Sequence, residues 1–330
     1  MRKLRQVVAA VAVFLPCLCG AAEPGSDLRV VPAGNGRAFQ LRDRSFSDLS
    51  GLTWVGGNRY AAVSDKVAAV IPLILAVDGR GQVTGVEPAA PVPVVTKLKD
   101  FEGIAWDGVS GRFHVSAEGG PGIQAFAAAD GRASAPWRLP SEFAMVRPNL
   151  ALESLTLESS SGRCWTANEE ALSVDGPVAG RAQGTAVRLQ EFSQEGRPLR
   201  QFCWVTEPAG ARFQGAGNGV ADLCLLPGGL LLLLERGFAS GGLHARIFLA
   251  DFRGATPTDG LASLVGEAVR PVRKRLLLDL PCGFTNYEGL CAGPELADGS
   301  RLLVMVADSN GGDRHSFLGL RLSGLPERKR

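Results

Sequence analysis

Nine acidic residues recur at regular places along this sequence, and carboxylates repeated in this way can hold a cation. Four of them begin an apolar segment, and the other five end the apolar segment that follows. The first four are Glu102, Glu153, Asp222 and Glu288, and the other five are Asp65, Glu118, Glu169, Glu235 and Asp308. If the fold gathers them, their like charges repel unless a cation lies among them or some are protonated. Calcium, a hard cation with oxygen ligands, is the first candidate.

The acid that begins each segment belongs to a short phrase that returns five times. The phrase is an acidic or polar residue, a small residue and an apolar strand, as in Glu102-Gly103-Ile104, and its first copy carries Ser50 in place of the acid. The apolar residues after the anchor are Leu52, Ile104, Leu155, Leu223 and Leu290, so the repeat is 51 to 68 residues long. Each interval has room for four short strands, which predicts the blade of a β-propeller.

The apolar runs are short and separated by Gly, Asp, Asn and Pro turns, so we expect an all-β chain. The spacing favours a single propeller of five four-stranded blades, with insertions near residues 175–184 and 255–269. Six blades remain an alternative if an insertion or the N-terminal segment contains a degenerate blade. In the second blade we expect strands at 104–106, 113–117, 123–127 and 135–139. A strand from 28–32 or 37–41 would complete the last blade and close the ring.

The strand directions of a propeller predict where the acids lie. The innermost strand of a blade and its neighbour run antiparallel, so the start of the first and the end of the second share one end of the central channel. The acids should therefore form a ring there, and the amides of Asn168 and Asn310 could add neutral oxygen ligands. Lys66 and Arg236, which directly follow ring acids, could balance charge or hold an anion. Acids at strand ends also cap turns without binding any ligand, and this reading stays open.

Residues 1–22 have the features of a secretory signal peptide. A basic start precedes the apolar stretch Val7–Leu15, and small residues place the cleavage near Ala21 or Ala22. We therefore expect an exported protein, periplasmic or secreted, with one domain at 23–330, no membrane span and a monomeric state. Without this leader the chain has 32 basic and 33 acidic residues, which argues against a nucleic-acid partner.

The cysteines and histidines give weaker signals. Five cysteines follow the leader, and we interpret them as buried thiols, although up to two disulfides of undetermined pairing are an alternative: Cys164, Cys203, Cys224, Cys282 and Cys291. His114 lies within a strand pattern and is read as structural, whereas His244 is read as a surface residue. His315, in a polar loop beyond Asp308, is the better candidate for a substrate contact.

The repeated phrases resemble a known family, the "esterase-like activity of phytase" or phytase-like proteins, over roughly residues 45 to 320. The matching phrases come in pairs, one per repeat. They are Leu49-Ser50-Gly51-Leu52 with Ala62-Val63-Ser64-Asp65, Phe101-Glu102-Gly103-Ile104 with Val115-Ser116-Ala117-Glu118, Leu152-Glu153-Ser154-Leu155 with Ala167-Asn168-Glu169, Asn218-Gly219-Val220-Ala221-Asp222-Leu223 with Leu234-Glu235-Arg236, and Asn286-Tyr287-Glu288-Gly289-Leu290 with Ala307-Asp308-Ser309-Asn310.

The resemblance implies a β-propeller with a phosphomonoesterase or related esterase activity. It also implies calcium bound by carboxylates, which holds phosphate and activates water. By this carry-over Glu102, Glu118, Glu153, Glu169, Glu235, Glu288 and Asp308 would be calcium ligands, to which the repeat adds Asp222. Lys66 and Arg236 would face the phosphate. Apart from the resemblance, the positions of Asn310 and His315 beyond Asp308 make them candidates for further substrate contacts. The chain departs from the pattern at Ser50, which replaces an acid, and at Ser154, which replaces a glycine.

The sequence is therefore compatible with three functions. The first is an exported hydrolase of phosphate monoesters, with a small-molecule ester as substrate and calcium at the mouth of the channel. The second is a non-catalytic propeller that binds a ligand or partner, with acids that are structural or hold one stabilising ion. The third is a lactonase-like hydrolase with one axial calcium and a nearby base such as His114.

Overall fold

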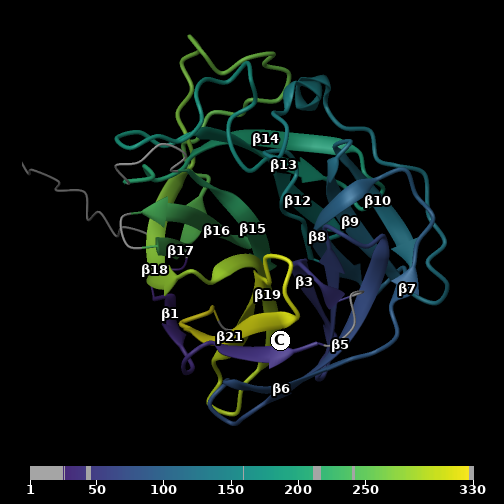
Figure 1. Cartoon of the computed structure of the whole chain (residues 1–330). Helices are drawn as coiled ribbons and strands as arrows, with labels where there is room; N and C mark the ends of the chain where they lie inside the picture. Colours follow the sequence, from purple (N-terminus) through teal and green to yellow (C-terminus); the bar gives the residue numbers. More distant parts are fainter. Residues whose placement is uncertain are drawn as a thin grey trace, which may run out of the picture.

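The computed structural model describes residues 25, 27–41, 46–158, 160–210, 217–239 and 242–326. Within this part, five antiparallel sheets stand around a central axis (Figure 1). The predicted all-β propeller of five blades is thus confirmed. No helix among these residues is long and apolar enough to cross a membrane. The predicted signal peptide at 1–22 lies outside the described residues.

The five blades follow one another along the chain, each with its innermost strand first. Blade 1 is β3 (Leu49–Gly56), β4 (Arg59–Ser64), β5 (Ala69–Val77) and β6 (Val83–Pro88), with β7 (Val92–Pro93) also paired to β5. Blade 2 is β8 (Lys99–Asp107), β9 (Arg112–Gly119) and β10 (Gly122–Ala127). Blade 3 is β11 (Thr156–Glu158), β12 (Arg163–Ala167), β13 (Ala186–Phe192) and β14 (Pro198–Val205), and a 3₁₀ helix, Ser141–Met145, precedes it. Blade 4 is β15 (Asn218–Leu226), β16 (Leu230–Ala239), β17 (Gly242–Asp251) and β18 (Arg273–Gly283).

Blade 5 joins the two ends of the described chain. Its strands β19 (Asn286–Glu295), β20 (Arg301–Asp308) and β21 (Arg314–Ser323) are followed at the outer edge by β1 (Arg29–Pro32). In that pairing Arg29 lies opposite Ser323. The strand β2 (Arg37–Gln40) pairs with the other end of β21, where Phe39 lies opposite His315. Both N-terminal segments proposed from the sequence therefore take part in closing the ring.

The apolar core lies between neighbouring blades. One cluster, for example, packs Leu232 and Leu234 of blade 4 against Leu303 and Met305 of blade 5. The leucine run of β16 supplies both faces of its blade, because Leu231 and Leu233 belong to the cluster shared with blade 3. Alternating side chains of one buried strand thus fill two separate cores. The stacking of blades fixes how the inner strands meet at the axis.

Two details differ from the expected strands. The predicted fourth strand of blade 2 at 135–139 is irregular, although the backbone N–H groups of Ser134 and Trp137 donate to Ala125 and Ile123 of β10. Pro136 in this segment lacks the backbone donor that a regular strand pairing needs. The two insertions contain no extra blade among the described residues; they pack together, with the N–H of Leu264 donating to Asp175. All five cysteines after residue 22 are free thiols.

Candidate functional site at the acidic mouth

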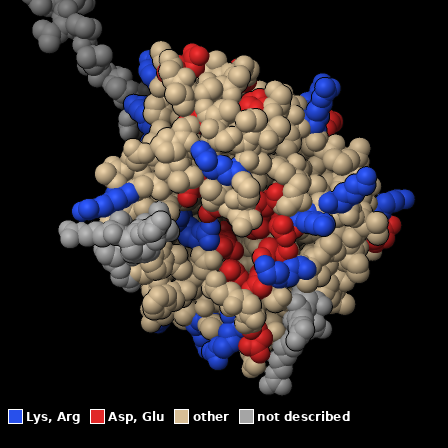
Figure 2. Space-filling model, turned by 45° about the horizontal axis from the view of Figure 1, so that its top comes forward, with Lys and Arg blue, Asp and Glu red and all other residues tan. Residues whose placement is uncertain are grey.

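Acidic side chains gather in a hollow at one end of the channel, and Lys and Arg side chains stand around it (Figure 2). We call this hollow the acidic mouth, and define it by the acids that interact electrostatically there. They are Asp65, Glu102, Glu118, Glu153, Glu169, Glu288 and Asp308. These seven residues come from blades 1, 2, 3 and 5. The predicted gathering of acids at one end of the channel is therefore present, with blade 4 as the exception.

Register shifts in the inner strands turn the acids that begin these strands, such as Glu102 and Glu288, into the mouth. The β8–β9 pairing shifts register between Phe101 and Ile104, and the β19–β20 pairing shifts between Tyr287 and Gly289. Each shift leaves an acid, Glu102 or Glu288, out of the regular pairing. Such a bulge turns a side chain away from the direction it would take in a regular strand.

The glycine after the acid is required by the narrow axis. A Cβ atom on Gly103 would lie 2.3 Å from the backbone nitrogen of Leu155, and one on Gly51 would lie 2.2 Å from the carbonyl oxygen of Glu102. The inner strands of adjacent blades thus touch backbone to backbone at this position. The small residue of the repeated phrase has a packing role, as a close approach of two backbones demands.

Blade 4 differs from the other blades. The sequence analysis took Asp222 as the acid of its phrase, but this residue lies one position beyond the place that the acid has in the other blades. The register shift of blade 4 falls between Val220 and Asp222, so Ala221 occupies the place of Glu102 and Glu288. Asp222 takes the place of the glycine, where its carboxylate accepts the N–H of Leu223 at 2.8 Å and that of Leu290 at 2.6 Å. Burial raises the pKa of Asp222 well above its usual value, against the effect of these amides. This predicted metal ligand is thus used to join inner strands.

Glu235, also predicted as a ligand, lies away from the mouth. Its carboxylate is fully buried and accepts from Trp204 Nε1, the N–H of Glu207 and Asn218 Nδ2, each at 2.8 Å. Trp204 belongs to β14, so Glu235 ties blade 4 to the outer strand of blade 3. Lys274 Nζ also lies 3.5 Å from Glu235 Oε1, so four donors surround the two oxygens, and the carboxylate belongs to a structural network.

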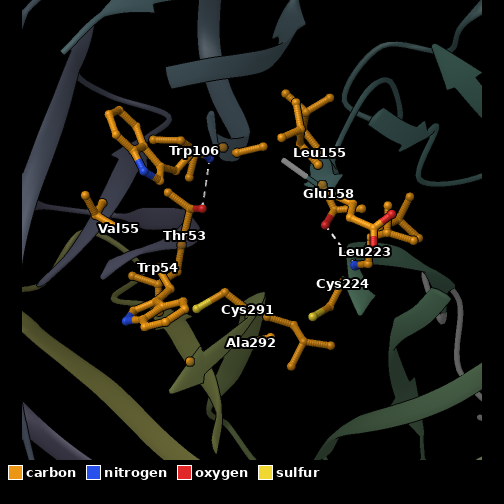
Figure 3. Close-up of a pocket in the computed structure, with 18 of the residues that line it drawn as sticks. Thr53, Trp54, Val55, Trp106, Leu155, Glu158, Leu223, Cys224, Cys291 and Ala292 are labelled. Carbon is orange, nitrogen blue, oxygen red and sulfur yellow. Dashed lines mark hydrogen bonds between the residues drawn. The ribbon is translucent and has the colours of Figure 1, made fainter. Parts of the chain in front are cut away.

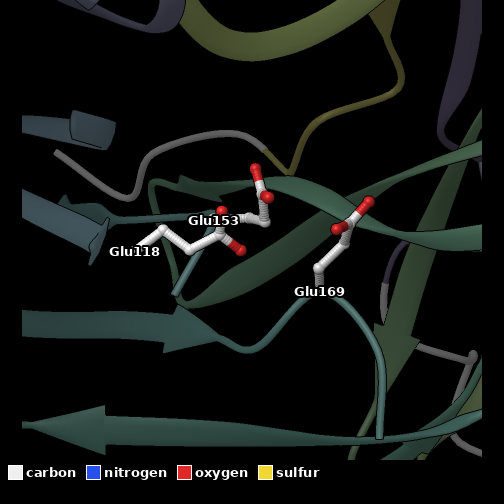
Figure 4. Close-up of side chains that lie close together, drawn as sticks. All are labelled: Glu118, Glu153 and Glu169. Atoms are coloured by element: carbon white, nitrogen blue, oxygen red, sulfur yellow. The ribbon is translucent and has the colours of Figure 1, made fainter. Parts of the chain in front are cut away.

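Three carboxylates approach one another closely enough to share one ion. Glu118, Glu153 and Glu169 each offer an oxygen within 4.8 Å of the others (Figure 4). Glu118 accepts the N–H of Ala151 at 2.6 Å, and Glu169 accepts from Arg236 at 2.5 Å. Glu153 is 8% exposed and makes no hydrogen bond or ion pair with any described residue. A buried carboxylate without a partner is costly, which marks the place where a cation would fit.

The electrostatics of the mouth favour protonation or cation binding. Burial, and then the nearby Glu102 and Glu169, raises the pKa of Glu153 well above its usual value. Burial also raises the pKa of Glu102, with further contributions from Glu288 and Glu118. The pKa of Glu288 is raised to about 7 by burial, although Arg236 opposes the shift.

Asp308 and Asp65 lie at the blade 1 and blade 5 side of the mouth. Burial raises the pKa of Asp308 to about 6, against the N–H of Asn310. Burial also raises the pKa of Asp65, which forms an ion pair with Lys66. Lys66 is largely exposed. Its positive charge is close enough to help lower the pKa of Asp48, the acid directly before β3. This side of the mouth therefore combines acids with an exposed cation, Lys66.

Arg236 is the cation at the centre of the mouth. Its guanidinium donates to Glu169 Oε1 at 2.5 Å, Glu288 Oε1 at 2.7 Å and Asn286 Oδ1 at 3.0 Å. Although burial opposes it, the charges of Glu169 and Glu288 raise the pKa of Arg236, so it stays charged. Of the neighbouring residues Glu235 and Arg236, only the basic one reaches the mouth, because Arg236 points inward while Glu235 points outward.

The remaining predicted residues are placed as follows. Asn310 is exposed in the turn after β20, and its backbone N–H donates to Asp308 Oδ1 at 2.9 Å. Asn168 is fully buried, with its amide bonded to the backbone of Glu170 and Arg188. His315 is also fully buried, inside the β2–β21 pairing, so its ring has no surface for a substrate.

His114 does not belong to the mouth. Its ring lies 3.9 Å from Asp107, at the other end of β8, and 5.2 Å from the Trp137 ring. Burial lowers the pKa of His114 to about 4, so the ring is neutral. The base that the lactonase-like reading needs is therefore not His114.

Asp48 lies beside Asp308 and Asp65 at the edge of the acidic mouth, and it is a further acid that the sequence analysis missed. Its carboxylate accepts from the hydroxyl of Ser309 at 2.9 Å and the N–H of Gly311 at 2.6 Å, which ties the start of β3 to the loop after Asp308. Its backbone φ is 50°, a conformation in which Asp is tolerated better than most residues. The signal in the sequence was its position two residues before Ser50, outside the repeated phrase.

The opposite end of the channel has a different character. A pocket of about 450 Å³ opens there among inner-strand residues of all five blades (Figure 3). Trp54, Trp106 and the thiols of Cys224 and Cys291 line it. Along β15, Ala221 faces the mouth and Leu223 lines this pocket, so Asp222 lies between the two ends. The acids and the apolar pocket are separate environments.

Two solved structures align over most of the chain: a nidogen/laminin complex, at 9% identity, a TM-score of 0.41 and coverage of 85% of this chain and 88% of that chain, and streptogramin B lyase, at 11% identity, 0.36, 88% and 98%. The search of curated proteins finds no match. A family model described as phytase-like, "esterase-like activity of phytase", matches residues 44–311. The chain therefore belongs to this phytase-like family.

Proposed function

We propose that the chain is an exported hydrolase of phosphate monoesters that works with calcium held at the acidic mouth. One observation carries this proposal: Glu153 is buried, has no hydrogen-bond or ion-pair partner among the described residues, and lies close to Glu118 and Glu169. Ligands on opposite sides of a calcium ion lie roughly 4.8 Å apart, because each Ca–O distance is about 2.4 Å. The spacing and the all-oxygen donor set therefore fit calcium. The family adds the expectation of esterase chemistry.

The residues of the mouth suggest how a phosphate ester would be handled. Calcium bound by the three glutamates would supply charge neutralisation and a more acidic water. Arg236 and Lys66 would attract the phosphate, since both are cations beside acids of the mouth. Glu288, whose burial raises its pKa to about 7, could hold the proton that the leaving alcohol needs.

The test is release of phosphate from phytate and from p-nitrophenyl phosphate, with 1 mM calcium or with EDTA. We expect calcium-dependent release that Glu153→Gln reduces by roughly 100-fold or more. Glu87→Gln is the matched control, because Glu87 is an exposed acid on β6, an outer strand of blade 1. Absence of phosphate release from both substrates in calcium would refute the proposal. Calcium-dependent thermal stabilisation without turnover would instead indicate the non-catalytic, ion-binding propeller.

A further inference from the structure

Blade 4 contributes no carboxylate to the acidic mouth, although its neighbours do. At the corresponding position of the repeated phrase, blade 3 has Glu153, just before β11, and blade 5 has the bulged Glu288, whereas blade 4 has Ala221. Within its second strand, β16, blade 4 has Glu235, whose carboxylate is bonded between blades 3 and 4. The next residue, Arg236, reaches the mouth instead. Blade 4 therefore supplies a positive charge where its neighbours supply negative ones.

Arg236 spans the gap that the missing acid leaves. One guanidinium nitrogen donates to Glu169 in blade 3 and the other to Glu288 in blade 5, at 2.5 Å and 2.7 Å. Asn286 holds the second nitrogen from a further direction at 3.0 Å and also donates to Glu288 at 2.7 Å. Two carboxylates and an amide thus fix the group in place. A planar guanidinium held in this way is rigid and keeps its charge at any pH at which the protein is folded.

In the other half of the mouth, no cation among the described residues is bonded to Glu118 or Glu153, although the charge of Arg236 opposes the rise in the pKa of both. Glu153 has no hydrogen-bond or ion-pair partner among the described residues, and the hydrogen bond that Glu118 accepts comes from a neutral backbone amide. Glu169 belongs to both halves. Its Oε1 is bonded to Arg236, and its carboxylate also lies close to those of Glu118 and Glu153. Of the seven acids, Glu169 and Glu288 therefore form an arginine-bound set and Glu118 and Glu153 form an open set, while Asp65, Glu102 and Asp308 belong to neither.

We infer that Arg236 stands where a second metal ion would otherwise be bound, so that the mouth takes a single divalent cation at Glu118, Glu153 and Glu169. A second ion beside Glu288 would lie next to the guanidinium that bonds Glu288 and Asn286, whereas the ion at the three glutamates shares only Glu169 with Arg236. Coulomb repulsion in a partly buried site is strong, so the repulsion is greatest beside Glu288. The inference deepens the proposed function and rests on it for the class of ion. It assigns Arg236 a role in setting the number of ions, beyond a contact with phosphate.

Calcium titration of the purified full chain, by calorimetry and by native mass spectrometry, tests this division. We expect one ion per chain. Glu153→Gln should weaken calcium binding at least 10- to 100-fold, roughly the cost of disturbing a metal ligand. Glu288→Gln should change the dissociation constant less than about threefold, because Glu288 belongs to the arginine-bound set and Gln keeps a hydrogen-bond acceptor for Arg236. Two or more ions in the unmodified protein, or equal losses for the two variants, would overturn the inference.

A second pair of variants addresses Arg236 directly. Arg236→Met removes the charge and frees Glu169 and Glu288, so we expect a second calcium ion per chain. Arg236→Lys keeps the positive charge and should keep the count at one. If Arg236→Met folds and still binds one ion with unchanged affinity, Arg236 does not set the count. If it does not fold, the comparison of Glu153→Gln with Glu288→Gln still decides.

The ion count can be measured without any substrate, which separates this inference from the proposed function. One ion per chain with no phosphate release would leave the inference standing and refute the hydrolase. Phosphate release that depends on several bound ions would do the reverse.

Discussion

The Oδ2 atom of Asp222 accepts the backbone N–H of Leu290 at 2.6 Å, so a side chain of blade 4 holds the inner strand of blade 5. Its Oδ1 atom accepts the N–H of Leu223 in its own strand. The backbone amide of Leu155, from blade 3, also contributes to the environment of this carboxylate. Three consecutive blades thus meet at one buried side chain, between the acidic mouth and the apolar pocket.

Asp222→Ala should destabilise the fold without affecting ion binding. The change leaves the N–H groups of Leu223 and Leu290 without their acceptor, and each buried unsatisfied group costs about 1–3 kcal/mol. We therefore expect a loss of about 2–5 kcal/mol in the free energy of unfolding, measured by urea denaturation. Asp259→Ala, at an exposed acid, serves as the control and should change stability by less than about 0.5 kcal/mol. A loss of calcium affinity in Asp222→Ala comparable to that in Glu153→Gln would place Asp222 in the metal site after all.

Gly103→Ala should be among the most disruptive single-methyl changes in the chain. Its Cβ would lie 2.3 Å from the backbone nitrogen of Leu155, where neither strand can move without disturbing the axis. Overpacking of this kind costs about 1–3 kcal/mol, and more when backbone must shift. Gly79→Ala is the matched control, because nothing lies within 4 Å of the Cβ that it would add. Equal melting temperatures for the two variants would contradict the close approach of blades 2 and 3.

Calcium should raise the melting temperature of the protein. An ion that binds only the folded state stabilises it by about 2.7 kcal/mol at a concentration 100 times its dissociation constant. Differential scanning fluorimetry with calcium and with EDTA measures the shift. Glu153→Gln should lose most of it, whereas Glu87→Gln should keep it, since Glu87 lies on an outer strand. An undiminished shift in Glu153→Gln would show that the ion binds elsewhere.

Without calcium, stability should fall as the pH rises from 5 to 8. Burial raises the pKa of Glu288 from its usual 4.5 to about 7, and that of Asp308 from 3.8 to about 6. Between those limits the folded state holds protons that the unfolded chain has lost, so increasing pH favours unfolding.

Calcium should remove much of this loss, because a bound cation offsets the same charges that protons offset at low pH. Its affinity should therefore increase over the same range of pH. Melting curves in EDTA at several pH values, with Glu288→Gln for comparison, measure the effect. A flat or rising stability between pH 5 and 8 in EDTA would contradict the crowding of carboxylates at the mouth.

The architecture was largely predictable from the sequence because its cause is local and repeated. Each phrase such as Glu102-Gly103-Ile104 encodes a bulge and a close approach, and the spacing of the phrases sets the number of blades. The strands that close the ring could also be predicted, because β21 needs an outer partner and the segments at 29–32 and 37–40 have strand character. The irregular edge at 135–139 was not, because an apolar pattern does not show which backbone groups find partners.

The roles of individual acids were harder to predict, because a shift of one residue turns a side chain elsewhere. Asp222 follows the apolar pattern of an anchor, but the register places Ala221 at the mouth. Glu235 follows an apolar run as Glu169 does, yet β16 continues beyond it to Ala239, and hydrogen bonds from Trp204 and Asn218 hold it between blades. These contacts come from parts of the chain that the repeated phrase does not encode.

The pairing of β1 with β21 also bears on how the molecule reaches its folded state. Arg29 and Ser323 are brought together from nearly opposite ends of the described chain. Such distant contacts slow folding, because the entropy lost in closing a long loop comes before the contacts are gained. Four blades can form by pairing neighbours along the chain, but the fifth must wait for both ends. The last step in folding should therefore be the docking of one short strand, β1, against β21. Removal of either of these strands should accelerate unfolding to a similar extent.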